Sequence, residues 1–229
     1  MKTSIVIPVY NEVGTIAEVI GHISHLYPNA EVIVVDDGST DGTREILEKV
    51  VQDNRQHGIQ ALFHEKNRGK GAAVRTGLDQ AVGEIIVIQD ADLEYHPEDY
   101  PVAVKLIEDG YADAVYGSRF LGPHRCFLFW HYAANKLLTL LCNMLYNTIL
   151  TDMETGFKVF RADVLRSLDI RSSTFDFEVE VTAKLLKRGY RVYEIPITYT
   201  GRGYEEGKKI TWKDGFRAVW AIIRYRLAD

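Results

Sequence analysis

The sequence predicts an α/β protein with a mostly parallel sheet flanked by helices. Short apolar runs alternate with segments in which apolar residues recur at helical spacing, as in βαβ units. The apolar runs are continuous rather than interrupted by polar residues, which is expected of strands covered by helices on both faces. The composition, 46% hydrophobic and 26% charged in 229 residues, suits a globular protein with a large core.

The first half of the chain alternates regularly between the two kinds of segment. Residues 3–9 (TSIVIPV) are apolar and rich in β-branched side chains, and they are followed by a helical pattern over residues 12–26 that includes Ile16, Val19, Ile20 and Ile23. The same reasoning predicts three further strands at 31–35, 60–64 and 84–89 and two further helices at 41–53 and 71–82.

The second half begins with a different character. Residues 126–150 are strongly apolar but carry His131, Asn135, Lys136 and two further asparagines. Such a segment suits one or two amphipathic helices that lie against the sheet or in a membrane interface. Later strands are predicted at 157–160 and 191–197, with a helix at 178–187 between them and an amphipathic helix at 216–227.

Bulk properties narrow the class further. The net charge of −5 lacks the basic footprint of a nucleic-acid-binding protein, so no nucleic-acid partner is expected. Cys126 and Cys142 have neither CxxC spacing nor paired histidines, which favours core or membrane-facing thiols in a cytosolic protein. We expect no signal peptide, no spanning helix and no linker, and therefore a single domain over residues 1–229.

Four loops follow the first four predicted strands, at residues 8–12, 36–43, 67–71 and 89–100. Ligands of open α/β sheets bind beyond the carboxyl ends of the strands. If the sheet is parallel, the four loops lie along one edge and form a single site.

The fourth loop is strongly acidic. Its sequence QDADLEYHPEDY places five carboxylates in twelve residues directly behind an apolar strand. Asp90 and Asp92, at positions i and i+2, can share one hard cation, and Mg²⁺ or Mn²⁺ prefers oxygen ligands together with substrate phosphates. The alternative is a solvated loop of no functional consequence.

The other loops each have two interpretations. Asn11 or Glu12 is a candidate helix cap, and residues 36–43 contain turn-forming residues and a possible N-cap at Thr40 or Asp41. The stretch NRGKG at 67–71 is similar to a phosphate-cradling loop but matches neither the dinucleotide fingerprint nor the P-loop spacing. It either contacts a ligand or starts a helix.

Taken together, VIPVYNE, VVDDGSTDGT, NRGKGAAVRTG and DAD resemble, in this order and spacing, the family 2 glycosyltransferases. The stretches YGSRF, DMETGFK, EIPI and EGKKI extend the resemblance to the polyprenyl-phosphate mannosyl- and glucosyltransferases of that family. The resemblance implies the GT-A fold and a nucleotide-sugar donor. A dinucleotide-binding dehydrogenase would carry G-x-G-x-x-G where residues 8–12 stand.

The resemblance also implies roles for individual residues. In the family, the first loop and the second aspartate of VDDGS hold the nucleoside, and the D-x-D pair holds a divalent cation. Residues 1–120 would form the nucleotide-sugar-binding half and residues 121–229 the acceptor half. The implied metal ligands are Asp90 and Asp92, with Asp92 the more direct, and Glu94 as a third. The implied nucleotide-sugar-binding residues are Pro8, Tyr10, Asn11, Glu12, Val35, Asp37, Lys70, Asp90, Ala91, Asp92, Arg119, Arg202, Lys208 and Lys209.

The acceptor determines which catalytic groups are needed. A lipid phosphate is largely anionic at pH 7, since its second pKa is near 6. It needs cations to hold it in line with the anomeric carbon rather than a general base. The resemblance supplies Arg119, Arg202, Lys208 and Lys209 for this purpose. Asp152 would be the base if the acceptor were a sugar hydroxyl, and otherwise a helix cap before Glu154. Asp92, Arg119 and Asp152 are thus the predicted catalytic residues.

The predicted activity is an inverting, metal-dependent transfer of a hexose from a UDP-glucose- or GDP-mannose-type donor to a polyprenyl or dolichyl phosphate. The alternatives are transfer to a hydroxyl of a polysaccharide or glycolipid, and a non-catalytic subunit, against which the retained Asp90 and Asp92 argue. The amphipathic segments predict peripheral contact with the cytoplasmic face of a membrane. The sequence leaves the sugar, the base, the lipid length and the oligomeric state open.

Overall fold

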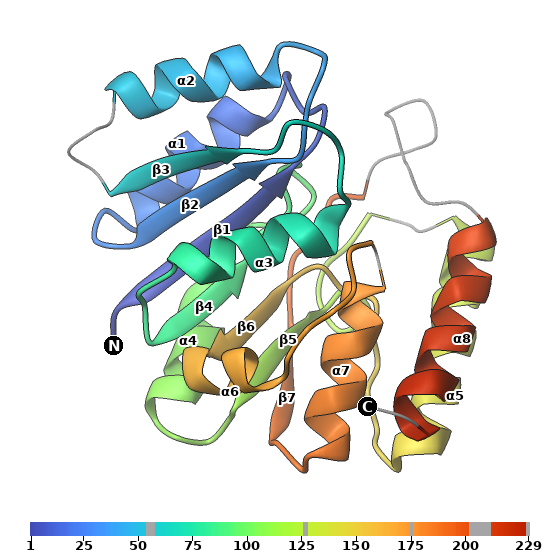
Figure 1. Cartoon of the computed structure of the whole chain (residues 1–229). Helices are drawn as coiled ribbons and strands as arrows, with labels where there is room; N and C mark the ends of the chain where they lie inside the picture. Colours follow the sequence, from blue (N-terminus) through green and yellow to red (C-terminus); the bar gives the residue numbers. More distant parts are fainter. Residues whose placement is uncertain (54–57, 126–127, 175, 202–211, 228–229) are drawn as a thin grey trace.

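The structure is a computed structural model of the chain, and it describes residues 1–53, 58–125, 128–174, 176–201 and 212–227. Its sheet has seven strands in the order β3-β2-β1-β4-β6-β5-β7 (Figure 1). The strands are β1 (Thr3–Val9), β2 (Glu31–Asp36), β3 (Ile59–Phe63), β4 (Ile85–Ile88), β5 (Ala114–Ser118), β6 (Lys158–Arg161) and β7 (Val192–Pro196).

The first four strands are parallel, as predicted. In the register between β1 and β2, Pro8 lies opposite Val35 and Val9 opposite Asp36. The carboxyl ends of these strands, and the loops that follow them, therefore lie at one edge of the sheet. The sheet departs from uniform direction at β6, which is antiparallel to both β4 and β5.

Helices cover both faces of the sheet (Figure 1). Alternate residues of β1, such as Ile5 and Ile7, join a core that contains α1 (Ile16–Leu26) and α4 (Tyr100–Glu108). Val6, which points to the other face, joins a core formed with α3 (Lys70–Gln80), α6 (Ala162–Ser167) and α7 (Phe177–Lys187). The helix α2 (Thr43–Asp53) packs against α1 and the edge strand β3. Burial of strands on both faces explains why their apolar runs are continuous.

The amphipathic segments form a third cluster. The predicted helices at 126–150 and 216–227 are α5 (Phe129–Tyr146) and α8 (Trp212–Leu227). Cys142 of α5, Ile222 of α8 and Val179 of α7 are buried together. Both helices therefore pack against α7, while Trp130, Met144 and Trp220 remain largely exposed.

The structure contains elements that were not predicted. They are α4, the short helix η1 (Pro97–Asp99) before it, β5 and α6. The predicted helix at 12–26 begins only at Ile16, because residues 10–15 belong to the first loop. The first three residues of YGSRF complete β5, a strand that the sequence did not predict.

Candidate active site

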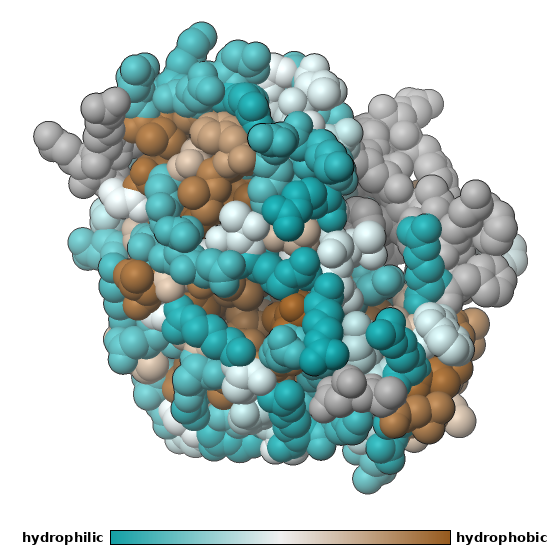
Figure 2. All heavy atoms as spheres, in the orientation of Figure 1, coloured by the Kyte–Doolittle hydropathy of each residue, from teal (hydrophilic) through white to brown (hydrophobic). Residues whose placement is uncertain are grey.

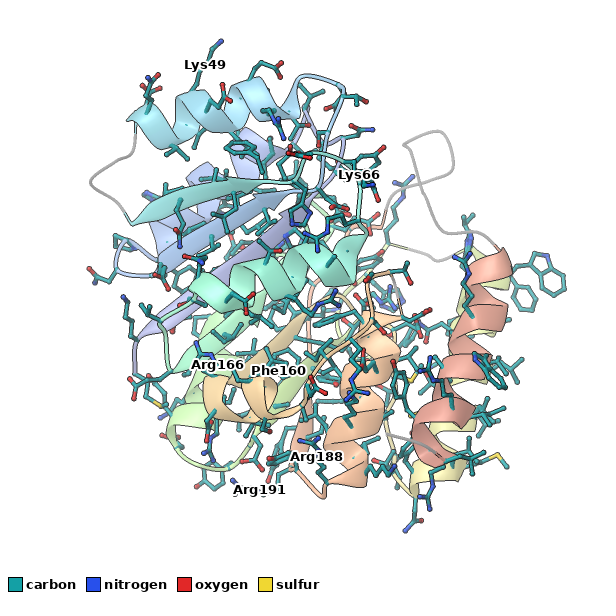
Figure 3. The ribbon with its side chains drawn as sticks, in the orientation of Figure 1. Lys49, Lys66, Phe160, Arg166, Arg188 and Arg191 are labelled. Atoms are coloured by element: carbon teal, nitrogen blue, oxygen red, sulfur yellow. The ribbon has the colours of Figure 1, made fainter. Side chains whose placement is uncertain are left out.

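The four predicted loops lie together at the carboxyl edge of the sheet and are tied to one another. The backbone N–H of Asn11 donates to Ser39 Oγ at 2.9 Å, and Asn11 Oδ1 accepts the N–H of Thr40 at 2.9 Å. Thr15 Oγ1 donates to the carbonyl of Ala91 at 2.9 Å. The first loop is thereby fixed to both the second and the fourth. In Figure 3, Lys66 marks this edge, whereas Arg188 and Arg191 lie at the opposite end of the sheet.

Asp37 connects the second loop to the third. It is 2% exposed, and its Oδ1 and Oδ2 accept the backbone N–H groups of Arg68 and Gly69 at 2.9 and 2.7 Å. Nδ1 of His64 lies 2.7 Å from Oδ1. Two of the NRGKG amides that could have cradled a phosphate, those of Arg68 and Gly69, are therefore bound by Asp37. Gly69 has φ +92, a conformation that favours glycine, at this tight approach.

Lys70 connects the third loop to the acidic loop. Its Nζ lies 2.6 Å from Oδ1 of Asp90 and 2.6 Å from Oε1 of Glu178. Burial alone would lower the pKa of Lys70, but the charges of Asp90 and Glu178 raise it above its ordinary value. The ammonium is thus a permanent cation within the predicted nucleotide-sugar site.

The carboxylates of the acidic loop differ in their partners. Asp92 Oδ1 accepts the N–H of Glu94 at 3.2 Å, and Glu94 Oε2 accepts the hydroxyl of Tyr199 at 2.6 Å. Within the described residues, no group of three or more His, Cys, Asp or Glu forms a metal-binding cluster. The three predicted metal ligands, Asp90, Asp92 and Glu94, therefore do not form a preformed metal-binding cluster. Asp90 and Asp92 fit a divalent cation as a partial, all-oxygen set that donor phosphates would complete.

Arg119 and Asp152 form a buried, bidentate ion pair. Arg119 Nε and Nη2 donate to Oδ2 and Oδ1 of Asp152, each at 2.7 Å, and the backbone N–H of Arg119 adds a bond of 3.0 Å. Asn135 Nδ2 donates to Oδ1 at 3.1 Å. Burial would raise the pKa of Asp152, which is 0% exposed, but the charge and hydrogen bonds of Arg119 hold it below its ordinary value.

Tyr199 joins the acidic loop to this ion pair. The guanidinium of Arg119 lies 5.4 Å from the centre of the Tyr199 ring, and the hydroxyl of the same ring is bound to Glu94. Tyr95, whose ring centre lies 5.2 Å from that of Tyr199, accepts the N–H of Gly156 at 2.8 Å. The carboxylates of the first half and the Arg119–Asp152 pair of the second half thus share one edge of the molecule.

A second set of charges is buried beneath the site. Lys158 is 1% exposed, donates to the carbonyls of Met153 and Thr155, and lies 4.4 Å from the centre of the Tyr116 ring. Burial lowers the pKa of Lys158 and raises that of Glu154. An acidic and a basic group whose neutral forms are favoured by burial therefore lie close together here.

The structure places most of the predicted site residues at this edge. Pro8 and Val35 pair across β1 and β2, and Asn11, Asp37, Lys70, Ala91 and Asp92 lie on the connected loops. Arg202, Lys208 and Lys209 lie outside the described residues. Contacts that sequence reasoning missed come from Tyr199, Asn135 and Glu178. None of the three belongs to a quoted motif, and each is far along the chain from its partner.

A model of the family described as glycosyl transferase family 2 matches residues 4–169, which include the four predicted loops and the Arg119–Asp152 pair. The chain belongs to this family. It is a glycosyltransferase with a GT-A fold, and the family resemblance read from the sequence is confirmed.

Curated relatives of this glycosyltransferase match along most of its length. It is 30% identical over 240 residues to the undecaprenyl-phosphate mannosyltransferase of Micrococcus luteus, covering 100% of this chain and 95% of that protein. It is 27% identical over 209 residues to the polyprenol monophosphomannose synthase of Mycolicibacterium smegmatis, covering 88% and 78%.

A solved structure confirms the fold. The glucosyl-3-phosphoglycerate synthase of Mycobacterium tuberculosis, crystallised with Mn²⁺, UDP and glucosyl-3-phosphoglycerate, superposes with a TM-score of 0.75 at 23% identity. The match covers 98% of this chain and 79% of that one. At this level of identity the likeness establishes the shared architecture.

Proposed function

We propose that this glycosyltransferase transfers a hexose, with inversion, from a UDP-glucose- or GDP-mannose-type donor to a polyprenyl phosphate. A phosphate oxygen of the acceptor attacks the anomeric carbon, and the bond from that carbon to the nucleoside diphosphate breaks. The names of the two curated relatives, which act on undecaprenyl or polyprenol phosphates, support this acceptor class. Within the molecule, the observation that carries the proposal is the binding of the Asp152 carboxylate by Arg119 and Asn135.

Asp152 has the properties of a partner for Arg119 rather than those of a general base. A base must accept a proton from its substrate, and its pKa is best placed near the working pH. The oxygens of Asp152 already accept four N–H groups, three from Arg119 and one from Asn135, and its pKa is lowered. A hydroxyl acceptor would depend on such a base, whereas a phosphate dianion attacks without one. The fixed guanidinium of Arg119 can help to hold that dianion.

The donor half would hold the nucleotide sugar along the connected loops. The first loop and the second loop would enclose the base and ribose, and Lys70 would offer its positive charge to the diphosphate. Asp92, together with Asp90, would hold Mg²⁺ or Mn²⁺. The cation would act as a Lewis acid that offsets the charge developing on the leaving diphosphate.

The exposed apolar side of α5 and α8 supports peripheral contact with a membrane, which we propose is its cytoplasmic face. The hydrophobic surface in Figure 2 includes the region where Figure 1 places the lower parts of these helices. Among helices in the described part of the chain, none has the length and hydropathy to cross a bilayer. Among the described residues of α5 and α8, the large apolar ones that are more than half exposed are Phe129, Trp130, Leu137, Leu140, Met144, Trp220 and Leu227. Contact with lipid would bring Arg119 close to a membrane-embedded acceptor.

The test compares a short polyprenyl phosphate with the matching free polyprenol, each with radiolabelled GDP-mannose or UDP-glucose. We expect label in an organic-soluble, mild-acid-labile product with the phosphate acceptor alone. The rate should rise through about pH 6 with the second ionisation of the phosphate. It should rise at higher pH with the corresponding phosphonate, whose second pKa is higher. Transfer to the free polyprenol would refute the proposal. A rate that rises at the same pH with the phosphate and the phosphonate acceptor would also refute it.

A further inference from the structure

Lys70 occupies an unusual position for a lysine. It is the first residue of α3, and a cation at a helix N-terminus is disfavoured by the helix dipole. Its side chain is only 12% exposed. Two carboxylates, Asp90 and Glu178, overcome both penalties by binding the ammonium at 2.6 Å each. Asp90 belongs to the predicted donor site, but Glu178 lies on α7, outside the motifs on which the family resemblance was based.

The segment before α7 is fixed directly against the start of α3. A Cβ atom on Gly71 would lie 2.4 Å from the carbonyl oxygen of Ser172, so the two backbones touch at this point. The N–H of Ala72 donates to the carbonyl of Ser173 at 3.2 Å, and Arg75 donates to the carbonyl of Ser172. Glu178, the second residue of α7, is therefore held at a defined distance from Lys70.

Burying Glu178 is costly, which argues that its charge has a use. The residue is 5% exposed, and within the described part of the chain its Oε2 has no hydrogen-bond partner. Glu154, whose Oε1 is likewise without a partner there, and Lys158 both interact electrostatically with Glu178. A buried carboxylate with an unsatisfied oxygen is unfavourable for stability. Its remaining oxygen is the one bound to Lys70.

We infer that Glu178 is a positioning residue of the donor site, which fixes the ammonium of Lys70 beside Asp90. An ammonium has three N–H donors. Within the described residues, Asp90 and Glu178 account for two of them, and the third can face a nucleoside diphosphate. Lys70 binds both Glu178 and Oδ1 of Asp90. With Oδ1 held in this way, the other oxygen of Asp90, Oδ2, which packs against Gly156, keeps a fixed orientation. This inference rests on the proposed nucleotide-sugar site.

The test is the isosteric change Glu178→Gln, with Asp113→Asn as a matched control. Asp113 is also a buried carboxylate in ion pairs, with Arg161 and Arg191, but it precedes β5 at the opposite edge of the sheet. Affinity for UDP and GDP with Mn²⁺ is measured by calorimetry, stability by thermal unfolding, and donor KM and kcat by transfer to a polyprenyl phosphate.

Both variants should lower Tm, and Glu178→Gln alone should weaken nucleotide binding, by about tenfold for one lost charge-assisted contact. Its donor KM should rise more than its kcat falls, and Glu178→Asp, which keeps the charge, should restore part of the affinity. In a Lys70→Met background, Glu178→Gln should cause no further loss, because Glu178 acts through Lys70.

Three outcomes would overturn the inference. The first is unchanged affinity and KM in Glu178→Gln, and the second is an equal loss in Asp113→Asn. If Glu178→Gln fails to fold, the Lys70→Met/Glu178→Met pair replaces it. The third outcome is a nucleotide affinity of Lys70→Met/Glu178→Met that is higher than that of Lys70→Met alone. Failure of the unaltered protein to bind either nucleotide would instead refute the donor site itself.

Discussion

The Arg119–Asp152 pair allows the acceptor to be tested by comparing Arg119→Ala with Asp152→Asn. Arg119→Ala removes two charge-assisted hydrogen bonds of 2.7 Å from Asp152, which keeps the backbone N–H at 119 and Asn135 Nδ2. Leaving a buried carboxylate without its partner costs about 3–5 kcal/mol of folding stability. Loss of one fixed donor to a reacting anion costs about 10²–10³-fold in rate. We expect both losses in Arg119→Ala.

The two losses can be separated. Replacing both members with apolar residues, as Arg119→Met/Asp152→Leu, should recover much of the stability, because no unpaired charge is left inside. The rate should stay as low as in Arg119→Ala. Transfer is measured with a short polyprenyl phosphate under saturating donor, and stability by thermal unfolding of the same preparations.

The pH dependence of stability gives an independent check. In the unaltered protein the lowered pKa of Asp152 contributes stability that is present above the ordinary carboxyl pKa and is lost below it. In Arg119→Ala, burial without the opposing cation should raise that pKa, so stability is lost as pH rises through it. The Tm difference between the two proteins should therefore narrow on acidification from pH 7.5 to 4.5.

The hydroxyl-acceptor alternative makes the opposite prediction. A base contributes about 10²–10⁴-fold in rate, so Asp152→Asn would then cost more than Arg119→Ala. A folded Asp152→Asn protein that is nearly inactive, beside an active Arg119→Ala protein, would refute our reasoning.

Three further perturbations address the donor site and the membrane surface. Asp92→Asn should abolish transfer and the Mn²⁺-dependent part of UDP or GDP binding measured by calorimetry. Tm should change little because the side chain is only half-buried. Near-normal turnover would contradict a metal role. Asp37→Ala leaves the part-buried amides of Arg68 and Gly69 without their acceptor, so it should lower the free energy of unfolding, by at most about 1–3 kcal/mol for each group, as well as nucleotide affinity. Unchanged Tm in denaturation scans would contradict this. Trp130→Ser/Trp220→Ser should reduce co-sedimentation with anionic liposomes at low salt, whereas Val102→Ser, at another exposed apolar site on α4, should not. Equal binding by the unaltered protein and both variants would place the contact elsewhere.

The sequence by itself determined the fold class and the position of the site. Continuous apolar strands alternating with helical patterns require a covered parallel sheet, and parallel strands bring their following loops to one edge. Asn11, Asp37, Lys70 and Asp92 could therefore be assigned to one site although they are separated by up to 81 residues. The family resemblance predicted the chemistry of that site, and the family model confirmed the family.

The tertiary structure decided which of these charges are paired. Arg119 and Asp152 are 33 residues apart in the chain, and Lys70 and Glu178 are 108 apart, so neither pair has a local sequence signal. The antiparallel strand β6 was equally hidden, because strand direction depends on the neighbour and not on the strand's own residues. Whether a carboxylate acts as a ligand, a base or the partner of a cation depends on burial and on the charges around it. For this reason the sequence left Asp152 as a candidate base, whereas in the folded protein it is the ion-pair partner of Arg119.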